Sequence, residues 1–154
     1  MSAINFVIIG YGGMGSYHAH TLMPAEKEKI NLLGVYDVLE KRRQVAAEKG
    51  LTAYARFEDV LTDKNVEAIL IATPNDSHKE LAIRGLQAGK KVICEKPVAM
   101  NVAELDEILA VAKETGQTFM VHQNRRWDPD FLVVRDLYQN QQIGEVFQLE
   151  SRVQ

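Results

Sequence analysis

Cysteine is almost absent from this 154-residue sequence, which contains only Cys94. An internal disulfide is therefore excluded, and a lone thiol is typical of proteins in a reducing compartment. No apolar stretch is long enough to span a bilayer, and the short apolar run near the N-terminus lacks the basic segment of a secretory signal. We therefore expect a cytoplasmic protein with no membrane partner.

Excess positive charge is also missing. The 21 Asp and Glu residues outnumber the 18 Lys and Arg residues, which gives a net charge of −3. A nucleic-acid-binding surface leaves a basic footprint, so no nucleic-acid partner is expected. With 46% hydrophobic and 25% charged residues, and no low-complexity tract or internal repeat, the sequence is typical of a globular domain of ordinary size.

Strand-like and helix-like segments alternate along the chain. Compact apolar runs predict buried strands, and periodic apolar residues between capping signals predict helices. The expected strands are residues 5–10, 30–37, 51–54, 66–73, 91–95 and 118–122. The expected helices are residues 13–23, 38–50, 57–63, 75–89, 102–115 and 130–141. The residues expected at helix starts are Asn75, Asn101 with Glu104 as a capping box, and Asp128 followed by Pro129.

This alternation predicts an α/β fold, a doubly wound and mostly parallel sheet with helices on both faces, as in the Rossmann fold. Residues 1–122 are expected to form this core, and residues 123–144 a linker loop and a helix. Residues 145–153 alternate between apolar and polar, as a half-exposed strand does. Residues 145–154 are therefore expected to be the first strand of a C-terminal substrate domain that this chain lacks.

The turn after the first expected strand has the sequence GYGGMG at residues 10–15, which matches the pattern G-x-G-x-x-G. Alone, this pattern also describes a glycine-rich turn without a ligand. A strand before it, a helix after it and Asp37 at the end of the second strand favour dinucleotide binding. Gly10 would permit the tight turn, Gly12 would let the backbone approach a pyrophosphate, and Gly15 would let helix and strand pack closely.

Asp37 can accept hydrogen bonds from both hydroxyls of an adenosine ribose and would repel a 2′-phosphate, so NAD is the expected cofactor. NADP is the alternative, because Lys41, Arg42 and Arg43 follow closely and one of them could hold a phosphate. The other interpretation of these three cations is a solvated helix face.

Polar clusters follow four of the expected strands, at Asp37, residues 73–78, residues 95–97 and residues 122–127. The carboxyl ends of parallel strands share one edge of the sheet, which is where ligands bind in such folds. Lys96 is the sharpest candidate for chemistry, because a lysine at a cleft can exchange a proton with a substrate hydroxyl. The plainer interpretation is an ordinary surface lysine.

These clusters make the chain resemble the Gfo/Idh/MocA oxidoreductase family. The resemblance rests on the glycine motif, ATPNDSH at 72–78, CEKPVAMN at 94–101 and HQNRRWDP at 122–129, in this order. It covers essentially the whole chain. It implies an NAD(P)-binding Rossmann domain, followed in the parent protein by an α/β domain that binds substrate and mediates homo-oligomerisation.

The resemblance also implies roles for individual residues. Lys96 would be the catalytic residue, near the nicotinamide and the substrate hydroxyl. Together with Arg42, the residues expected to bind the cofactor are Gly10, Tyr11, Gly12, Gly13, Met14, Gly15, Asp37, Thr73, Pro74, Asn75, His78, Glu95 and Lys96. The residues expected to border the substrate cleft are Asn124, Arg125, Arg126 and Trp127. No metal is expected.

The expected activity is hydride transfer between a nicotinamide and a hydroxyl-bearing carbon of a sugar, a cyclitol or a related small molecule. The family's acid/base residues, typically an Asp and a His, lie in the C-terminal domain, so the chain is expected to be inactive alone. One alternative is a non-enzymatic dinucleotide sensor. Another is a mononucleotide or phosphate binder that uses only the first half of the fold.

The remaining candidates have plainer interpretations. His18 and His20 are two positions apart and do not share a helix face, so ordinary hydrogen-bonded histidines are expected there. His122 fits either a cleft-facing or a structural role. Cys94 lies within an expected strand and is expected to be a small core residue.

Overall fold

The computed structural model describes residues 2–150 and 152. The chain divides into two compact units, Met1–His122 and Gln123–Gln154. Among the described helices, none is both long enough and apolar enough to cross a membrane. The first unit contains the whole sheet.

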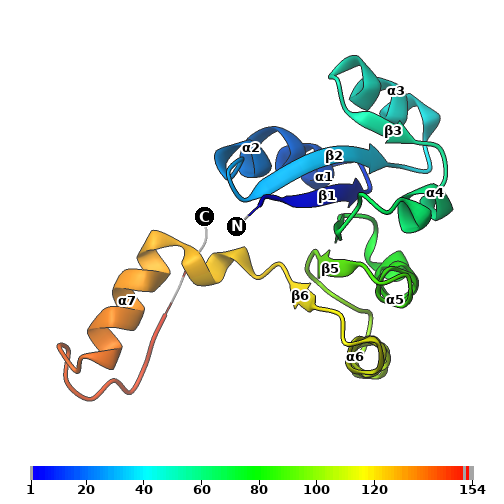
Figure 1. Cartoon of the computed structure of the whole chain (residues 1–154). Coiled ribbons are helices and arrows are strands. Elements are labelled where there is room, and N and C mark those ends of the chain that lie inside the picture. The colour runs from blue at the N-terminus through cyan, green and yellow to red at the C-terminus, as the bar shows by residue number, and fades with distance from the viewer. Residues whose placement is uncertain (1, 151, 153–154) are drawn as a thin grey trace. The chain divides into compact units, whose positions relative to one another are not determined.

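Six parallel strands form one sheet in the order β3-β2-β1-β4-β5-β6 (Figure 1). The strands are β1 Ile4–Ile9, β2 Ile30–Tyr36, β3 Thr52–Tyr54, β4 Ala68–Ile71, β5 Lys91–Cys94 and β6 Phe119–Val121. Because β1 pairs with both β2 and β4, the winding direction of the chain reverses between β1 and β4. This is the doubly wound arrangement of the Rossmann fold, and it confirms the predicted fold class.

Helices cover both faces of this sheet. Successive strand residues point to opposite sides, and in the buried strands the residues on both sides are apolar. The helices of the first unit are α1 Gly13–Tyr17, α2 Met23–Ala25, α3 Glu40–Glu48, α4 Phe57–Thr62, α5 His78–Gln87 and α6 Val102–Thr115. In β1, Val7 and Ile9 pack into one buried cluster with α4, α5 and α6, while Phe6 and Ile8 pack into the other with α2 and α3. On the first of these faces α5 and α6 lie side by side.

The first helical segment is longer and less regular than predicted. A π-helical turn, His18–Leu22, joins α1 to α2 without a break, and the Met23 N–H donates to the carbonyl of His18. Pro24 follows and has no N–H to give to the preceding turn, so regular α-helical bonding is interrupted there. The helical segment ends at Ala25 rather than at residue 23.

The predicted helix starts are only partly observed. Asn101 Oδ1 accepts from the Glu104 N–H at 3.0 Å, which is the expected cap of α6. Asp128 precedes Pro129 at the start of α7, Pro129–Gln139, although its side chain makes no capping hydrogen bond. Asn75 is not the cap of α5, because Asn75–Ser77 forms a 3₁₀ turn and α5 begins only at His78.

The second unit contains a 3₁₀ turn, Asn124–Trp127, and α7. The strand expected over residues 145–154 is not formed in residues 145–150, which are irregular and mostly exposed. A strand is stabilised by backbone hydrogen bonds to a neighbouring strand, and the described sheet provides none to this segment. Residues 151, 153 and 154 lie outside the described residues, and the start of a further domain stays a prediction.

Candidate functional site

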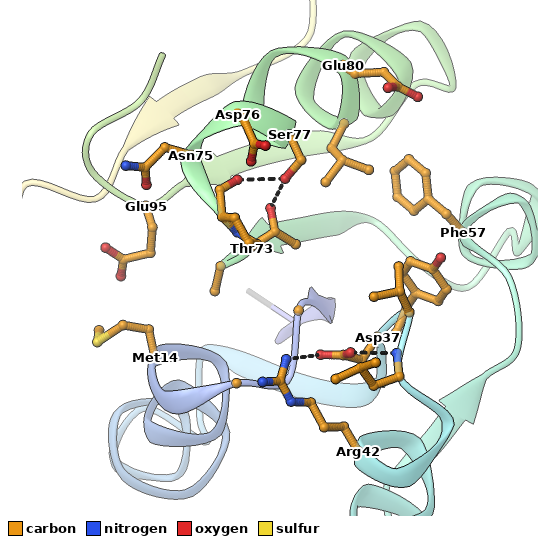
Figure 2. Close-up of a pocket in the computed structure, with 18 of the residues that line it drawn as sticks. Met14, Asp37, Arg42, Phe57, Thr73, Asn75, Asp76, Ser77, Glu80 and Glu95 are labelled. Atoms are coloured by element: carbon orange, nitrogen blue, oxygen red, sulfur yellow. Dashed lines mark hydrogen bonds and ion pairs between the residues drawn. The ribbon is translucent and has the colours of Figure 1, made fainter. Parts of the chain in front are cut away.

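A cavity of about 850 Å³ opens at the carboxyl edge of the sheet, where β1 and β4 are neighbours. This is the topological switch point, at which doubly wound sheets bind ligands. Figure 2 shows Asp37 and Arg42 at one end of the cavity and Glu95 at the other. The lining residues in the segments that follow β1, β2, β4 and β5 are Gly10, Gly12, Met14, Asp37, Val38, Leu39, Arg42, Ala72, Thr73, Pro74, Asn75, Asp76, Ser77, Glu95 and Lys96.

The turn after β1 is packed too closely for a side chain at two positions. Gly10 has a φ of +94°, and a Cβ there would lie 2.7 Å from the carbonyl oxygen of Ala72. A Cβ on Gly15 would lie 1.8 Å from the carbonyl oxygen of Gly10. Only glycine at these two positions lets the helix start directly against the strand, which is the packing expected from the sequence.

The start of α1 leaves backbone N–H groups free beside the cavity. Gly12 is the N-cap, and as a glycine it has no side chain that could accept from the first N–H groups of the helix. The continuous helical segment from Gly13 to Ala25 places the positive end of its dipole at this point. Such a helix start binds phosphate and pyrophosphate groups, so the residues present fit the pyrophosphate of a dinucleotide.

Asp37 is almost fully buried at the end of β2, and three donors converge on its carboxylate. The Tyr11 N–H donates to Oδ2 over 2.7 Å, and the Leu39 N–H donates to Oδ1 over 2.8 Å. The Arg42 guanidinium donates from Nη1 to Oδ2 over 3.2 Å (Figure 2). The carboxylate therefore connects the glycine turn, the end of β2 and the start of α3.

The three cations after Asp37 have different surroundings. Arg42 is half-exposed, lines the cavity and lies against Gly12. Arg43 donates from Nη1 to the carbonyl oxygens of Asp37 and Val38, over 2.7 and 3.2 Å. Lys41 is exposed, as a solvated helix face predicts. Arg42 is the cation placed where a phosphate in the cavity could be met.

The loop after β4 runs between the two ends of the cavity (Figure 2). Ser77 Oγ lies 2.7 Å from Thr73 Oγ1 and 2.6 Å from the carbonyl oxygen of Pro74, which closes the loop on itself. Asn75 and Asp76 also line the cavity. This loop therefore offers polar side chains to a ligand from a backbone that is internally hydrogen-bonded.

His78, which is expected to bind the cofactor, lies in the interior of the first unit. Its ring is fully buried and is not part of the described cavity lining. Nε2 lies 2.9 Å from the carbonyl oxygen of Thr73, and Nδ1 lies 3.0 Å from that of Pro97. The ring connects the loop after β4 to the loop after β5 and so supports the cavity wall, while its contact with a cofactor stays a prediction.

Glu95 is the second buried carboxylate that lines the cavity. Its Oε1 accepts from Nε2 of His18 over 2.7 Å and from Nδ1 of His122 over 3.0 Å. Its Oε2 accepts from the Lys96 N–H over 3.2 Å. His18 belongs to the π-helical turn and His122 follows β6, so this carboxylate joins three distant parts of the first unit.

Burial raises the pKa of Glu95, but the hydrogen bond from His18, the charge of His122 and the Lys96 N–H together hold it below its ordinary value. Burial lowers the pKa of His18, and this effect outweighs the opposing effect of Glu95. At neutral pH the pair is therefore a neutral imidazole that donates to an ionised carboxylate.

The ligand-type atoms of His18, Glu95 and His122 lie within 4.8 Å of one another, a spacing also found in metal sites. Here both ring nitrogens are within hydrogen-bond distance of the same carboxylate oxygen. The two rings pack edge to face, with centroids 4.8 Å apart. Hydrogen bonding accounts for this geometry without an ion.

Lys96 lines the cavity and its side chain is exposed. Its peptide bond to Pro97 is cis, and its N–H is held by Glu95. The neighbouring Cys94 is buried, and burial together with the charge of Glu95 raises the pKa of its thiol to about 12. Cys94 is thus the core residue that was predicted, and Lys96 carries the accessible functional group at this end.

The four residues expected at the substrate cleft, Asn124, Arg125, Arg126 and Trp127, form the 3₁₀ turn of the second unit and are exposed. Arg125 donates from Nη1 to Oδ2 of Asp128 over 3.0 Å. Their contact with a substrate stays a prediction.

Sequence reasoning missed two parts of the site. The partners of Glu95 are 77 and 27 positions away from it, and no local spacing signals their meeting. It also missed the wall beyond Asp37, where Arg84 stacks 4.9 Å above the ring centroid of Phe57. Glycine spacing and strand ends indicate the cavity but not this wall, which depends on how α4 and α5 pack.

Comparison with known proteins agrees with this geometry. The sequence model of the Gfo/Idh/MocA family, described as an oxidoreductase family with an NAD-binding Rossmann fold, matches residues 4–123. An uncharacterised oxidoreductase of Schizosaccharomyces pombe is 33% identical, over 99% of this chain and 42% of its own length. Myo-inositol 2-dehydrogenase of Thermotoga maritima is 32% identical, over 94% of this chain and 44% of its own length.

Among solved structures, the crystal structure of an NAD-binding protein from Listeria innocua is similar, with a TM-score of 0.90 and 51% identity. The match covers 96% of this chain and 42% of that one. The chain therefore spans less than half the length of each of these relatives.

Proposed function

The chain belongs to the Gfo/Idh/MocA oxidoreductase family with its NAD-binding Rossmann fold, and from this premise we propose that its cavity binds NAD for a dehydrogenase. The reaction is hydride transfer between the nicotinamide and a hydroxyl-bearing carbon of a small molecule. The observation that carries the proposal is the buried carboxylate of Asp37 directly beside a glycine turn with free helix N–H groups. This combination recognises a ribose next to a pyrophosphate.

Each part of the cavity has a task in this proposal. Asp37 accepts hydrogen bonds from the adenosine ribose, and the backbone around Gly12 holds the pyrophosphate. The two halves of a doubly wound fold each bind one half of a dinucleotide, so the nicotinamide half belongs to the side of β4 and β5, near Glu95 and Lys96. When bound, the nicotinamide supplies the hydride chemistry.

Lys96 is the group of this chain that handles the proton. Alcohol oxidation releases a proton from the hydroxyl, and an amine at the cavity can accept or return it. Lys96 has the exposure that contact with a substrate requires, and the Glu95 carboxylate fixes its backbone. Similarity to a myo-inositol 2-dehydrogenase supports a cyclitol or a sugar as substrate.

NAD is proposed over NADP because Asp37 lies where an adenosine 2′-phosphate would meet a negative charge. Arg42 favours NADP instead, because its guanidinium forms an ion pair with Asp37 and could also bind a 2′-phosphate. The chain is further proposed to bind its cofactor but to need the rest of a longer parent for turnover and oligomerisation, because it spans 42% of its S. pombe relative.

The decisive experiment is a fluorescence titration of this chain with NADH and NADPH. NADH is expected to bind at least as well as NADPH, and the Asp37→Ala variant is expected to weaken NADH by more than about tenfold. Asp106→Ala is the matched control, because this exposed carboxylate lies on α6 and does not line the cavity. Absence of NADH binding at millimolar concentration in the unmodified chain would refute the proposal.

A further inference from the structure

Glu95 lies at the end of the cavity opposite Asp37, and we infer that its buried charge makes this domain favour the oxidised, cationic form of the dinucleotide over the reduced form. The inference rests on the proposed function and deepens it, because it names which redox state the site selects and which residue selects it. It concerns binding, so it does not require turnover by this chain.

The Glu95 carboxylate is ionised and buried. Its side chain is 6% exposed, and it receives donors from His18 and His122 on one oxygen and from the Lys96 N–H on the other. The three partners that the structure describes for it are all donors, which is the environment of an ionised carboxylate. A charge with so little contact with water is weakly screened and acts on its neighbours over several ångströms.

The charge of Glu95 lies at the end of the cavity where the nicotinamide is proposed to bind. Figure 2 shows the Glu95 carboxylate between Asn75 and Met14, on the opposite side of the cavity from Asp37. The two ends of the cavity therefore each contain one buried carboxylate. Asp37 lies at the adenosine end, where the oxidised and reduced dinucleotides are chemically identical. Glu95 lies at the nicotinamide end, where the oxidised ring has a positive charge and the reduced ring has none.

The groups around Glu95 offset little of its negative charge. His18 is buried and held neutral by that burial, and it donates a hydrogen bond without adding a full charge. The ammonium of Lys96 is exposed, so water and salt screen it more strongly than they screen the carboxylate. His122, with its side chain 24% exposed, is the remaining titratable neighbour. At neutral pH the dominant fixed charge at this end is therefore negative.

The test compares the dissociation constants of NAD⁺ and NADH, the first by calorimetry and the second by fluorescence, at pH 7.5. Glu95→Gln keeps the size and the Oε1 acceptor for both histidines while it removes the charge. This variant is expected to weaken the binding of NAD⁺ relative to that of NADH by about tenfold, the order of effect that one partly screened charge has on a neighbouring charge. Asp37→Asn is the matched control, because it removes a buried carboxylate from the other end and is expected to weaken both forms alike.

An unchanged NAD⁺/NADH ratio in a folded Glu95→Gln variant overturns the inference, and so does an equal change of the ratio in Asp37→Asn. If Glu95→Gln does not fold, the unmodified chain decides, because the inference requires it to bind NAD⁺ more tightly than NADH. Equal dissociation constants, or a smaller one for NADH, overturn the inference. If neither NAD⁺ nor NADH binds the unmodified chain, the proposed function itself fails.

Discussion

The Tyr11 N–H donates to Oδ2 of Asp37 over 2.7 Å, so the carboxylate proposed to recognise ribose also holds the glycine-rich turn in place. A carboxylate has about four acceptor positions. Tyr11, Leu39 and Arg42 occupy three of them in this structure. Of these donors only the Arg42 guanidinium is on a flexible side chain. Its movement therefore decides how many hydrogen bonds Asp37 can accept from ribose hydroxyls.

Removing the Arg42 guanidinium is therefore expected to separate the two cofactors. Arg42→Ala should weaken NADPH by about tenfold, because a charge-assisted bond to the 2′-phosphate is lost. NADH should bind equally well or better, because an acceptor position on Asp37 becomes free. Fluorescence titrations of both cofactors measure this, with Lys41→Ala as the exposed neighbouring control. Equal losses for NADH and NADPH would show that Arg42 does not discriminate between them.

Two glycine substitutions are expected to fail in different ways. Gly15→Ala forces a Cβ to 1.8 Å from a backbone oxygen and should lower the free energy of unfolding by about 2 kcal/mol or more. Gly12→Ala places its Cβ 3.5 Å from the flexible Arg42 side chain and should leave stability nearly unchanged. It should still weaken NADH, because the methyl group narrows the pyrophosphate site. Urea denaturation and NADH titration of both variants test this, and a stable Gly15→Ala variant would contradict it.

The buried ring of His78 is expected to contribute strongly to stability. His78→Leu removes both ring nitrogens that lie within hydrogen-bond distance of the carbonyl oxygens of Thr73 and Pro97, and with them the N–H donor of the ring. The free energy of unfolding should fall by about 2–4 kcal/mol, and NADH affinity should fall as well, because the two loops are no longer joined. Ser77→Ala, on the same loop but more exposed, should cost at most about 1 kcal/mol. Comparable losses in the two variants would exclude a special role for the ring.

Stability is expected to decrease as the pH falls from 7.5 to 5.5. The pKa of His18 is lowered in the folded protein, chiefly by burial. Below about pH 6.5, the ordinary pKa of histidine, the unfolded chain therefore binds a proton that the folded chain does not. This single proton reduces the free energy of unfolding by at most ~1.4 kcal/mol per pH unit. Because the pKa of Glu95 lies below its ordinary value, the stability it contributes is lost only at more acidic pH.

Urea denaturation across this pH range measures the effect. His18→Gln keeps an amide donor for Glu95 but cannot titrate, so its stability should change less with pH than that of the unmodified chain. Equal slopes for the two proteins would show that another group is responsible.

The sequence was sufficient to predict those features that local patterns determine. Apolar runs give the strands, and the spacing from the glycine turn to Asp37 identifies the switch-point edge. The orientation of side chains at strand ends was not predictable in the same way. The sequence around His78 is the same whether its ring faces a ligand or the core. The packing of α5 against the sheet determines that the ring is buried. The meeting of His18 with Glu95 depends equally on a π-helical turn that no periodicity revealed.

The adjacency of β1 and β4 has a consequence for biosynthesis. Phe6 pairs with Ala68, so β1 acquires its second neighbour only after more than half of this unit has been translated. A nascent chain that has not yet exposed Lys96 has the glycine turn and Asp37 but lacks the opposite wall of the cavity. A dinucleotide that spans both walls, as proposed above, would therefore stabilise this unit only once the chain as far as Lys96 has folded.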